Sequence, residues 1–244
     1  MALAIVIEQH GGPEVLQPRE VVVGEPGPGE LRLRQTFVGV NFHDVYVRSG
    51  LYDTLALPGI PGIEGAGVHD LRPGDRIGYV TGRYGCYASE RLLPAALALK
   101  LPDALDDRQA AALLLKGLTV DMLVNRVHPL RAGEWVLVQA AAGGVGRLLV
   151  QWASRLGAQV IGTVGSPAKV QAARAAGCRE VILYREEDVA ARVAAITGGQ
   201  GVDLVYDGVG RDSFAGSLAS LAQAAAAHAH LESRTAAQPI VLRV

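Results

Sequence analysis

The sequence predicts an α/β protein in two parts, a β-rich part followed by a part in which strands and helices alternate. Three observations support this division. Prolines, glycines and short β-rich runs fill the chain up to about residue 110. Beyond that point, apolar runs alternate with alanine-rich amphipathic segments that end at glycines. The length of 244 residues is enough for two ordinary domains.

Charge and composition exclude several classes of protein. The chain has 23 basic and 24 acidic residues, so it is neither a nucleic-acid binder that works by bulk charge nor a disordered acidic tail. No apolar run reaches the roughly 18 residues of a membrane helix, and the N-terminus lacks the features of a secretory signal. Cys86 and Cys178 are too few for a disulfide framework or a four-cysteine zinc site. We expect a soluble, cytoplasmic protein with no nucleic-acid or membrane partner.

The first part reads as a small barrel or sandwich of short strands. Its β-rich runs are Ala4–Glu8, Val21–Val23, Leu31–Val40, Arg76–Val80 and Tyr87–Leu92. Glycine- and proline-rich turns separate them, for example at residues 24–29 and 72–75. Short strands at such intervals are typical of compact antiparallel β domains.

The second part reads as repeated βαβ units on a parallel sheet. The expected strands are Trp135–Ala140, Gln159–Val164, Glu180–Tyr184 and Val202–Tyr206. The expected helices are Gly146–Leu156, Ser166–Ala176 and Asp188–Thr197. Each helix is followed by glycine, the usual residue just beyond a helix end. Buried strands that alternate with amphipathic helices indicate a doubly wound parallel sheet with right-handed crossovers.

The turn between the first of these strands and its helix resembles a phosphate-binding fingerprint. In residues 140–146, Ala141, Gly143 and Gly146 occupy the three slots of G-x-G-x-x-G. The pattern supplies a tight turn, a close backbone approach to a pyrophosphate and close packing of helix on strand. The amides and dipole at the helix N-terminus then hold the phosphates. A glycine turn that only packs is the alternative, but the surrounding βαβ units favour dinucleotide binding.

The end of the second strand favours NADPH over NADH. An NAD site carries an acidic residue there to bind the ribose 2′-hydroxyl. This chain instead has Gly165, Ser166 and, three residues later, Lys169. A hydroxyl group and a cation are suited to a 2′-phosphate. The alternative is a Lys169 side chain that only points into solvent, although lysine is rare here, with just three in the chain.

Six segments together carry a resemblance to a known family. They are residues 41–52, 116–119, 140–146, 184–188, 205–210 and 231–234. In these segments the chain is similar to the NADPH-dependent quinone oxidoreductases. These form the zinc-independent, zeta-crystallin-like branch of the medium-chain dehydrogenases/reductases. The similarity extends along almost the whole chain.

The resemblance implies a fold and an activity. It implies a GroES-like catalytic domain over residues 1–112 and a Rossmann NADPH-binding domain over 113–230, with 231–244 returning to the catalytic domain. It also implies that NADPH and a quinone meet in the cleft between the domains, where hydride is transferred without a metal. The expected assembly is a homodimer.

The resemblance also implies roles for particular residues. Gly165, Lys169 and Tyr184 would surround the 2′-phosphate and adenosine, while Gly143, Gly144 and Val145 would follow the pyrophosphate. Thr119 would lie near the nicotinamide, with Asn41 and Tyr46 as the catalytic residues of the substrate pocket. Capping and core packing would explain Asn41 and Tyr46 equally well. Lys116 either contacts the cofactor or holds the helix at the domain junction.

No metal site is expected. Zinc relatives place cysteine or histidine ligands in the cleft, and the equivalent position here, after the run Leu31–Val40, is Asn41. The six histidines show no ligand spacing, and His228 and His230, on a presumed helix, do not share a face. Cys86 and Cys178 have no basic partner in sequence and are expected to be packing residues.

The chain departs from the family pattern at two places, after Val68 and after Leu221. At the first place the chain lacks a short strand and turn of the family pattern. At the second it lacks the distal half of the Rossmann domain. These gaps leave other functions open. One is an NADPH-dependent enone or enoyl double-bond reductase, and the other is a non-catalytic, crystallin-like NADPH-binding protein.

Overall fold

The computed structural model describes residues 1–70 and 75–222. The chain divides into two compact units, Met1–Leu115 and Lys116–Val244. Each unit is described by itself below. None of the helices in the described residues is long and apolar enough to cross a membrane.

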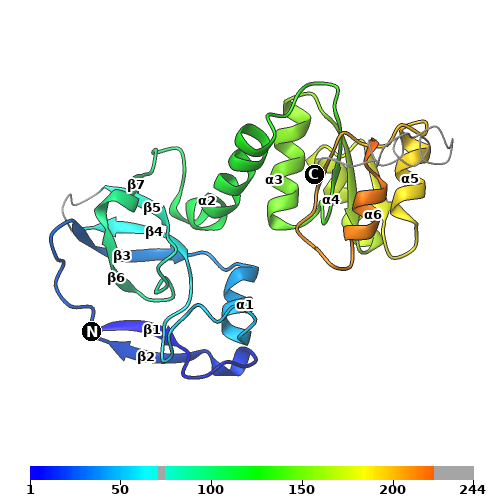
Figure 1. Ribbon diagram of the computed structural model, residues 1–244. Coiled ribbons are helices and arrows are strands. Elements are labelled where there is room, and N and C mark those ends of the chain that lie inside the picture. The colour runs from blue at the N-terminus through cyan, green and yellow to red at the C-terminus, as the bar shows by residue number, and fades with distance from the viewer. Residues whose placement is uncertain (71–74, 223–244) are drawn as a thin grey trace, which may run out of the picture. The chain divides into compact units, whose positions relative to one another are not determined.

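The first unit is built on an antiparallel sheet (Figure 1). Its five strands follow the order β6-β3-β4-β5-β7. Their bounds are β3 (Glu30–Val38), β4 (Glu64–His69), β5 (Arg76–Val80), β6 (Glu90–Pro94) and β7 (Leu99–Lys100). A separate two-stranded sheet pairs β1 (Ala2–Val6) with β2 (Gln17–Val21). The predicted β-rich domain is therefore confirmed, with strand ends that differ by a few residues.

The sequence pattern misses the central strand β4 and the short strand β7. Strand β4 carries Gly65, Ala66 and Gly67, residues of low β propensity. Gly67 is needed because the backbones approach closely: a Cβ there would lie 2.0 Å from the Arg34 carbonyl oxygen, while one on Gly65 would lie 2.6 Å from the Gln35 side chain. Close backbone packing thus explains a strand that has almost no β-branched side chains.

Two helices belong to this part of the chain. Helix α1 (Phe42–Ser49) follows β3 and ends at Gly50, whose φ of +80° suits glycine. Helix α2 (Asp107–Asp121) contains the boundary between the units and continues as a π-helical turn over Met122–Val127. Short 3-10 turns cover Pro13–Val15 and Ala95–Leu97.

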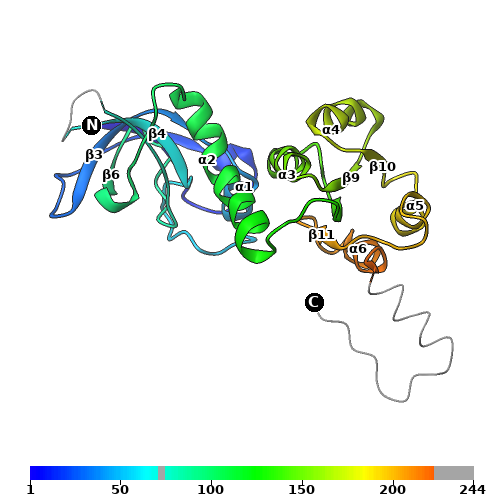
Figure 2. The same ribbon diagram turned by 90° about the horizontal axis from the view of Figure 1, so that it is seen from above.

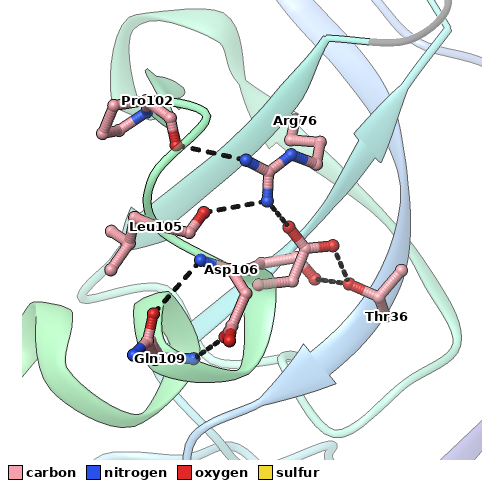
Figure 3. A network of polar contacts seen from close by, with 8 residues as sticks. Thr36, Arg76, Pro102, Leu105, Asp106 and Gln109 are labelled. Atoms are coloured by element: carbon pink, nitrogen blue, oxygen red, sulfur yellow. Dashed lines mark hydrogen bonds and ion pairs between the residues drawn. The ribbon is translucent and has the colours of Figure 1, made fainter.

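The start of α2 is fixed by a polar network (Figure 3). The Arg76 guanidinium donates to the carbonyl oxygens of Pro102 and Leu105 at 3.1 and 2.9 Å, and to Asp107 Oδ1 at 3.0 Å. The Thr36 hydroxyl lies 2.6 Å from Asp107 Oδ2. One arginine of β5 therefore ties the sheet to the first turn of α2.

Replacing Arg76 with methionine should lower the free energy of unfolding by about 1–3 kcal/mol, because it leaves carbonyl groups and Asp107 without a charged donor. The control is Lys100→Met, which removes an ion pair to Asp75 whose lysine side chain is 72% exposed. That control should cost less than about 1 kcal/mol, since exposed pairs contribute little. Urea unfolding measures both, and equal losses would contradict the anchoring role.

The second unit is a parallel sheet covered on both faces. Its strands β8 (Trp135–Val138), β9 (Gln159–Val164), β10 (Glu180–Leu183) and β11 (Leu204–Tyr206) follow the order β10-β9-β8-β11. Figure 2 shows α3 (Gly144–Arg155) and α4 (Val170–Ala176) on one face, with α5 (Val189–Ile196) and α6 (Phe214–Ala219) on the other. This is the strand order of a Rossmann sheet. All four strands are parallel, and successive strands are added on one side of β8 up to β10 and then on its other side with β11.

Alternate side chains of the strands fill the two cores of this unit. Val136 and Val138 pack with residues of α3 and α4, while Leu137 and Ile161 pack with Val193 of α5. A period of two is expected for a strand buried on both faces. The predicted βαβ pattern is confirmed, except that the helix predicted from Ser166 begins as a 3-10 turn over Pro167–Lys169.

Candidate functional site

The turn between β8 and α3 has the geometry that a phosphate fingerprint requires. Ala140 takes a φ of +52°, the only positive φ at a non-glycine residue among those described. A Cβ on Gly146 would lie 2.3 Å from the Ala140 carbonyl oxygen, and one on Gly143 would lie 3.1 Å from it. The two glycines therefore let the helix begin directly against the turn.

The first turn of α3 presents backbone amides and no acidic side chain. The amides of Gly144, Val145 and Gly146 precede the first intrahelical bond, which Arg147 donates to the Gly143 carbonyl oxygen at 2.9 Å. Val145 is 36% exposed, so this turn is accessible. The residues present fit the pyrophosphate of a dinucleotide.

Lys116 lies against this turn. A Cβ on Gly144 would be 2.9 Å from Lys116 Cε, so the lysine stem packs over the glycine. Thr119 lies one helical turn further along α2. The structure thus brings Lys116 to the predicted pyrophosphate site, where its stem packs on the turn. The choice between a cofactor role and a structural role stays open.

The predicted 2′-phosphate site lies at the ends of β9 and β10, which are neighbours in the sheet. Gly165 follows β9, and its missing Cβ would lie 2.9 Å from Tyr184 Oη, so the tyrosine ring packs on the glycine. Ser166 caps the 3-10 turn that ends at Lys169. No acidic residue occupies the end of β9. Gly165, Ser166, Lys169 and Tyr184 therefore share one edge of the sheet.

Arg185 is a further cation at this edge; it lies within the segment 184–188, but the sequence analysis assigns it no role. Its Cζ lies 6.0 Å from the centroid of the Tyr184 ring, in cation–π geometry. The turn that carries it follows β10 directly, beside the residues that follow β9. A second positive charge therefore lies near the predicted 2′-phosphate site.

The two predicted catalytic residues belong to the first unit. Asn41 caps α1, and its Nδ2 donates to Glu64 Oε1 at 2.8 Å. Glu64 is fully buried, and its Oε2 accepts from the Leu115 amide at 2.8 Å. Sequence reasoning missed Glu64, because nothing near it in sequence marks it as the partner of Asn41. The structure therefore gives Asn41 both a capping position and a buried carboxylate partner.

Tyr46 belongs to an aromatic cluster on α1 and the segment after it. Its ring centroid lies 5.2 Å from that of Tyr52 and 6.1 Å from that of Phe42. His43 stacks on Tyr84 at 5.9 Å, and its Nε2 lies 3.2 Å from the Tyr84 hydroxyl. Phe42 is 77% exposed and Tyr52 44%. This cluster offers flat apolar surface beside hydroxyl groups.

Asp44, at the start of α1, is a buried carboxylate. Burial raises its pKa, although the backbone amide of Asn41 and the Tyr87 hydroxyl both donate to Asp44 Oδ2, at 2.8 and 3.0 Å, which lowers it. Its Oδ1 is buried and has no hydrogen-bond partner. The native state therefore binds a proton at Asp44 more readily than the unfolded chain does.

Asp44→Asn should make stability less sensitive to pH. Because the native pKa of Asp44 is raised, the wild type should gain stability as pH falls through that native pKa toward the ordinary value of an aspartate, about 4. The asparagine variant keeps an acceptor for Asn41 and Tyr87 without burying a charge. It should be at least as stable as the wild type near neutral pH and should lose that advantage in acid. Urea unfolding across this range measures both slopes, and identical slopes would contradict the assignment.

The described residues contain no cluster of three or more histidine, cysteine or acidic side chains able to hold a metal ion. Burial raises the pKa of Cys86 to about 11, and Arg91 Nη1 lies 2.9 Å from its sulfur. Burial also raises the pKa of Cys178 to about 12. Both thiols are therefore protonated packing groups at neutral pH. His228 and His230 lie outside the described residues.

The fold and the turn define a Rossmann-type dinucleotide-binding protein with a second, β-rich unit. Comparison with known proteins agrees with this class. The family model of the zinc-binding dehydrogenases matches residues 144–228. The quinone oxidoreductase of Pseudomonas aeruginosa is 46% identical over 226 residues, 89% of this chain and 70% of that protein. The 2-haloacrylate reductase of a Burkholderia species is 44% identical over 231 residues, 89% of this chain and 69% of that protein.

Solved structures give the same result. The quinone oxidoreductase of Escherichia coli, crystallised with NADPH, matches with a TM-score of 0.87 and 44% identity, over 90% of this chain and 70% of that one. The quinone oxidoreductase of Pseudomonas syringae also has a TM-score of 0.87, at 46% identity, over 91% of this chain and 70% of that one. The chain therefore belongs to the quinone oxidoreductase family of medium-chain dehydrogenases/reductases, and it is an oxidoreductase. The rest of each relative's length has no counterpart in the alignment.

Proposed function

We propose that this protein reduces quinones by hydride transfer from NADPH, without a metal. The observation that carries the proposal is the paired phosphate sites of the second unit. The glycine turn of α3 is suited to the pyrophosphate, and the edge formed by Gly165, Lys169 and Tyr184 is suited to a 2′-phosphate. The cofactor is NADPH, which the Escherichia coli relative binds in its crystal structure.

The residues of the second unit hold and orient the nucleotide. Amides at the start of α3 bind the pyrophosphate, while Lys169 and Ser166 bind the 2′-phosphate and Tyr184 packs on the adenosine. Bound NADPH supplies the hydride. The protein's part is to fix the direction of the nicotinamide toward the acceptor, which lowers the entropic barrier to transfer.

The acceptor would be held by the aromatic residues around α1. Tyr46 and Tyr52 offer ring faces on which a flat quinone can stack. Reduction of a quinone also needs protons at its oxygens, which the Tyr46 hydroxyl or water would deliver. Asn41 would donate a hydrogen bond to a quinone oxygen, because Glu64 holds its amide in one orientation.

The proposal requires no metal. In a zinc relative, cysteine or histidine ligands would surround the cation. Here the Glu64 carboxylate instead accepts hydrogen bonds from the side-chain amide of Asn41 and the backbone amide of Leu115. A carboxylate that already accepts these bonds supports a hydrogen-bonding role rather than a ligand role. Activity should therefore survive dialysis against a chelator.

A second candidate is reduction of an electron-poor carbon–carbon double bond. The similarity to the 2-haloacrylate reductase favours it. Both reactions take a hydride from the same cofactor, so the nucleotide site does not distinguish them. The homodimer and the cytoplasmic location stay predictions.

The experiment is a rate comparison with the full chain. NADPH consumption is followed with a para-benzoquinone, a naphthoquinone, an enone and a 2-haloacrylate at equal concentrations. The proposal expects the quinones to be reduced fastest, with the rate unchanged after chelation. Faster consumption with the enone or the haloacrylate would replace quinone reduction by the second candidate.

A further inference from the structure

A chain of hydrogen-bonded polar side chains, three of them buried, crosses the sheet at the carboxyl ends of its strands. Thr163 Oγ1 donates to Gln139 Oε1 at 2.6 Å, and Gln139 Nε2 donates to Ser217 Oγ at 3.0 Å. Ser217 Oγ donates to Asp207 Oδ2 at 2.7 Å. These residues come from β9, the end of β8, α6 and the end of β11. Thr163, Gln139 and Ser217 are each at most 7% exposed.

The charge state of Asp207, at one end of these hydrogen bonds, determines which group donates in each of them. Burial raises the pKa of Asp207, but donors from Gly210, Ser217, Ser213 and Val209 outweigh it, and the pKa lies below its ordinary value. An ionised carboxylate can only accept. The Ser217 proton therefore points to Asp207, and Ser217 must accept from the Gln139 amide. The carbonyl of Gln139 then faces Thr163, which donates to it.

The other end of the chain is the phosphate turn. Because Thr163 directs its proton to Gln139, its lone pair accepts the Ala140 amide at 3.2 Å. The Thr163 carbonyl oxygen accepts the next amide, that of Ala141, at 2.9 Å. Ala140 has the left-handed φ of +52°, which costs an alanine about 1–2 kcal/mol. Two hydrogen bonds to Thr163 therefore hold the backbone on either side of Ala140 in this strained conformation. The orientation of the amides that follow depends on it.

We propose that Asp207, Ser217, Gln139 and Thr163 are positioning residues, which hold the turn at Ala140 so that the amides of α3 face the cofactor phosphate. The proposal rests on the proposed NADPH site. It explains why polar side chains are buried between β8 and β11, where a Rossmann sheet receives its nucleotide. Polarised chains of this kind strengthen each hydrogen bond along their length.

The first test compares Thr163→Val with Thr163→Ser. Valine keeps the shape but leaves the Ala140 amide and the Gln139 carbonyl without a partner, and the NADPH Kd should rise about tenfold. Serine keeps the hydroxyl, and its Kd should stay within about threefold. Thr197→Val is the matched control, because this buried hydroxyl bonds to Val193 and Gly201 instead. A Kd that follows thermal stability alone across the three variants would overturn the proposal.

The second test asks whether the two ends are coupled. Asp207→Asn introduces a donor that reverses or breaks the chain, and it should raise the NADPH Kd about tenfold. The double variant with Thr163→Val should bind no more weakly than either single variant, since both changes break the same chain. Multiplied effects of about a hundredfold would overturn the proposal.

A third measurement does not use the cofactor. In the free protein, hydrogen exchange at the Ala140 amide should be faster in Asp207→Asn than in the wild type, while exchange in α5 stays unchanged. Unchanged exchange at the Ala140 amide would overturn the proposal that these hydrogen bonds hold the turn. Failure of the wild type to bind NADPH would instead overturn the proposed function, and the exchange result would still decide whether the chain holds the turn.

Discussion

Replacing Gly146 with alanine is expected to weaken NADPH binding by more than about a hundredfold. The new Cβ would lie 2.3 Å from the Ala140 carbonyl oxygen, a backbone atom that cannot rotate away. Helix α3 must then shift, and the amides of its first turn lose their alignment with the pyrophosphate. If two charge-assisted hydrogen bonds of about 1.5 kcal/mol each are lost, the Kd rises by more than about a hundredfold. Fluorescence titration of the nicotinamide measures this effect.

The control for Gly146→Ala is Gly82→Ala. A Cβ on Gly82 would have no described atom within 4 Å, and the backbone there has no positive φ. This variant should bind NADPH like the wild type. Far-ultraviolet circular dichroism shows whether the Gly146 variant still folds. A folded Gly146→Ala protein with unchanged affinity would contradict the phosphate role of the turn.

Replacing Lys169 with alanine is expected to remove most of the preference for NADPH over NADH. Lys169 ends the 3-10 turn after β9, beside Gly165 and Tyr184 at the predicted 2′-phosphate site. A charge-assisted hydrogen bond contributes about 1.5–3 kcal/mol, so the KM for NADPH should rise roughly 10- to 150-fold. The KM for NADH should stay nearly constant, because NADH has no phosphate at that position.

Arg174→Ala is the matched control for Lys169→Ala. Arg174 is an exposed cation on α4, the helix that follows Lys169. Its removal lowers the net charge by the same amount without changing the end of β9. The ratio of KM values should stay at the wild-type value. An equal fall of the ratio in both variants would show that the preference comes from general charge, with no special role for Lys169.

The periodicity of the sequence was sufficient to predict the second unit. Each strand is a short apolar run, the helices α3, α4 and α5 each end near a glycine, and local pattern and tertiary structure agree there. The first unit was harder. Strand β4 contains Gly67 because the backbone of β3 approaches closely, and Gly65 because the side chains of Gln35 and Tyr79 lie against it. Only the paired strands reveal these requirements.

Within the site, residues that act through the backbone could be predicted and residues that act through distant partners could not. The glycine turn is recognisable because its parts are contiguous in sequence. In contrast, Glu64 contacts Asn41 across 23 positions, and Gln139 contacts Ser217 across 78. Such pairs have no spacing rule, since they depend on how strands are ordered in a sheet. The roles of Asn41 and Tyr46 stay predictions for the same reason.

The central claim is that this chain consumes NADPH when a quinone is present. The direct measurement mixes the full chain with NADPH and a para-benzoquinone and follows the loss of nicotinamide absorbance, with NADH in a parallel reaction. We expect loss of NADPH that depends on both protein and quinone, and a much slower loss of NADH. Tight NADPH binding without any consumption across the quinones, or equal rates with the two nucleotides, would contradict this expectation.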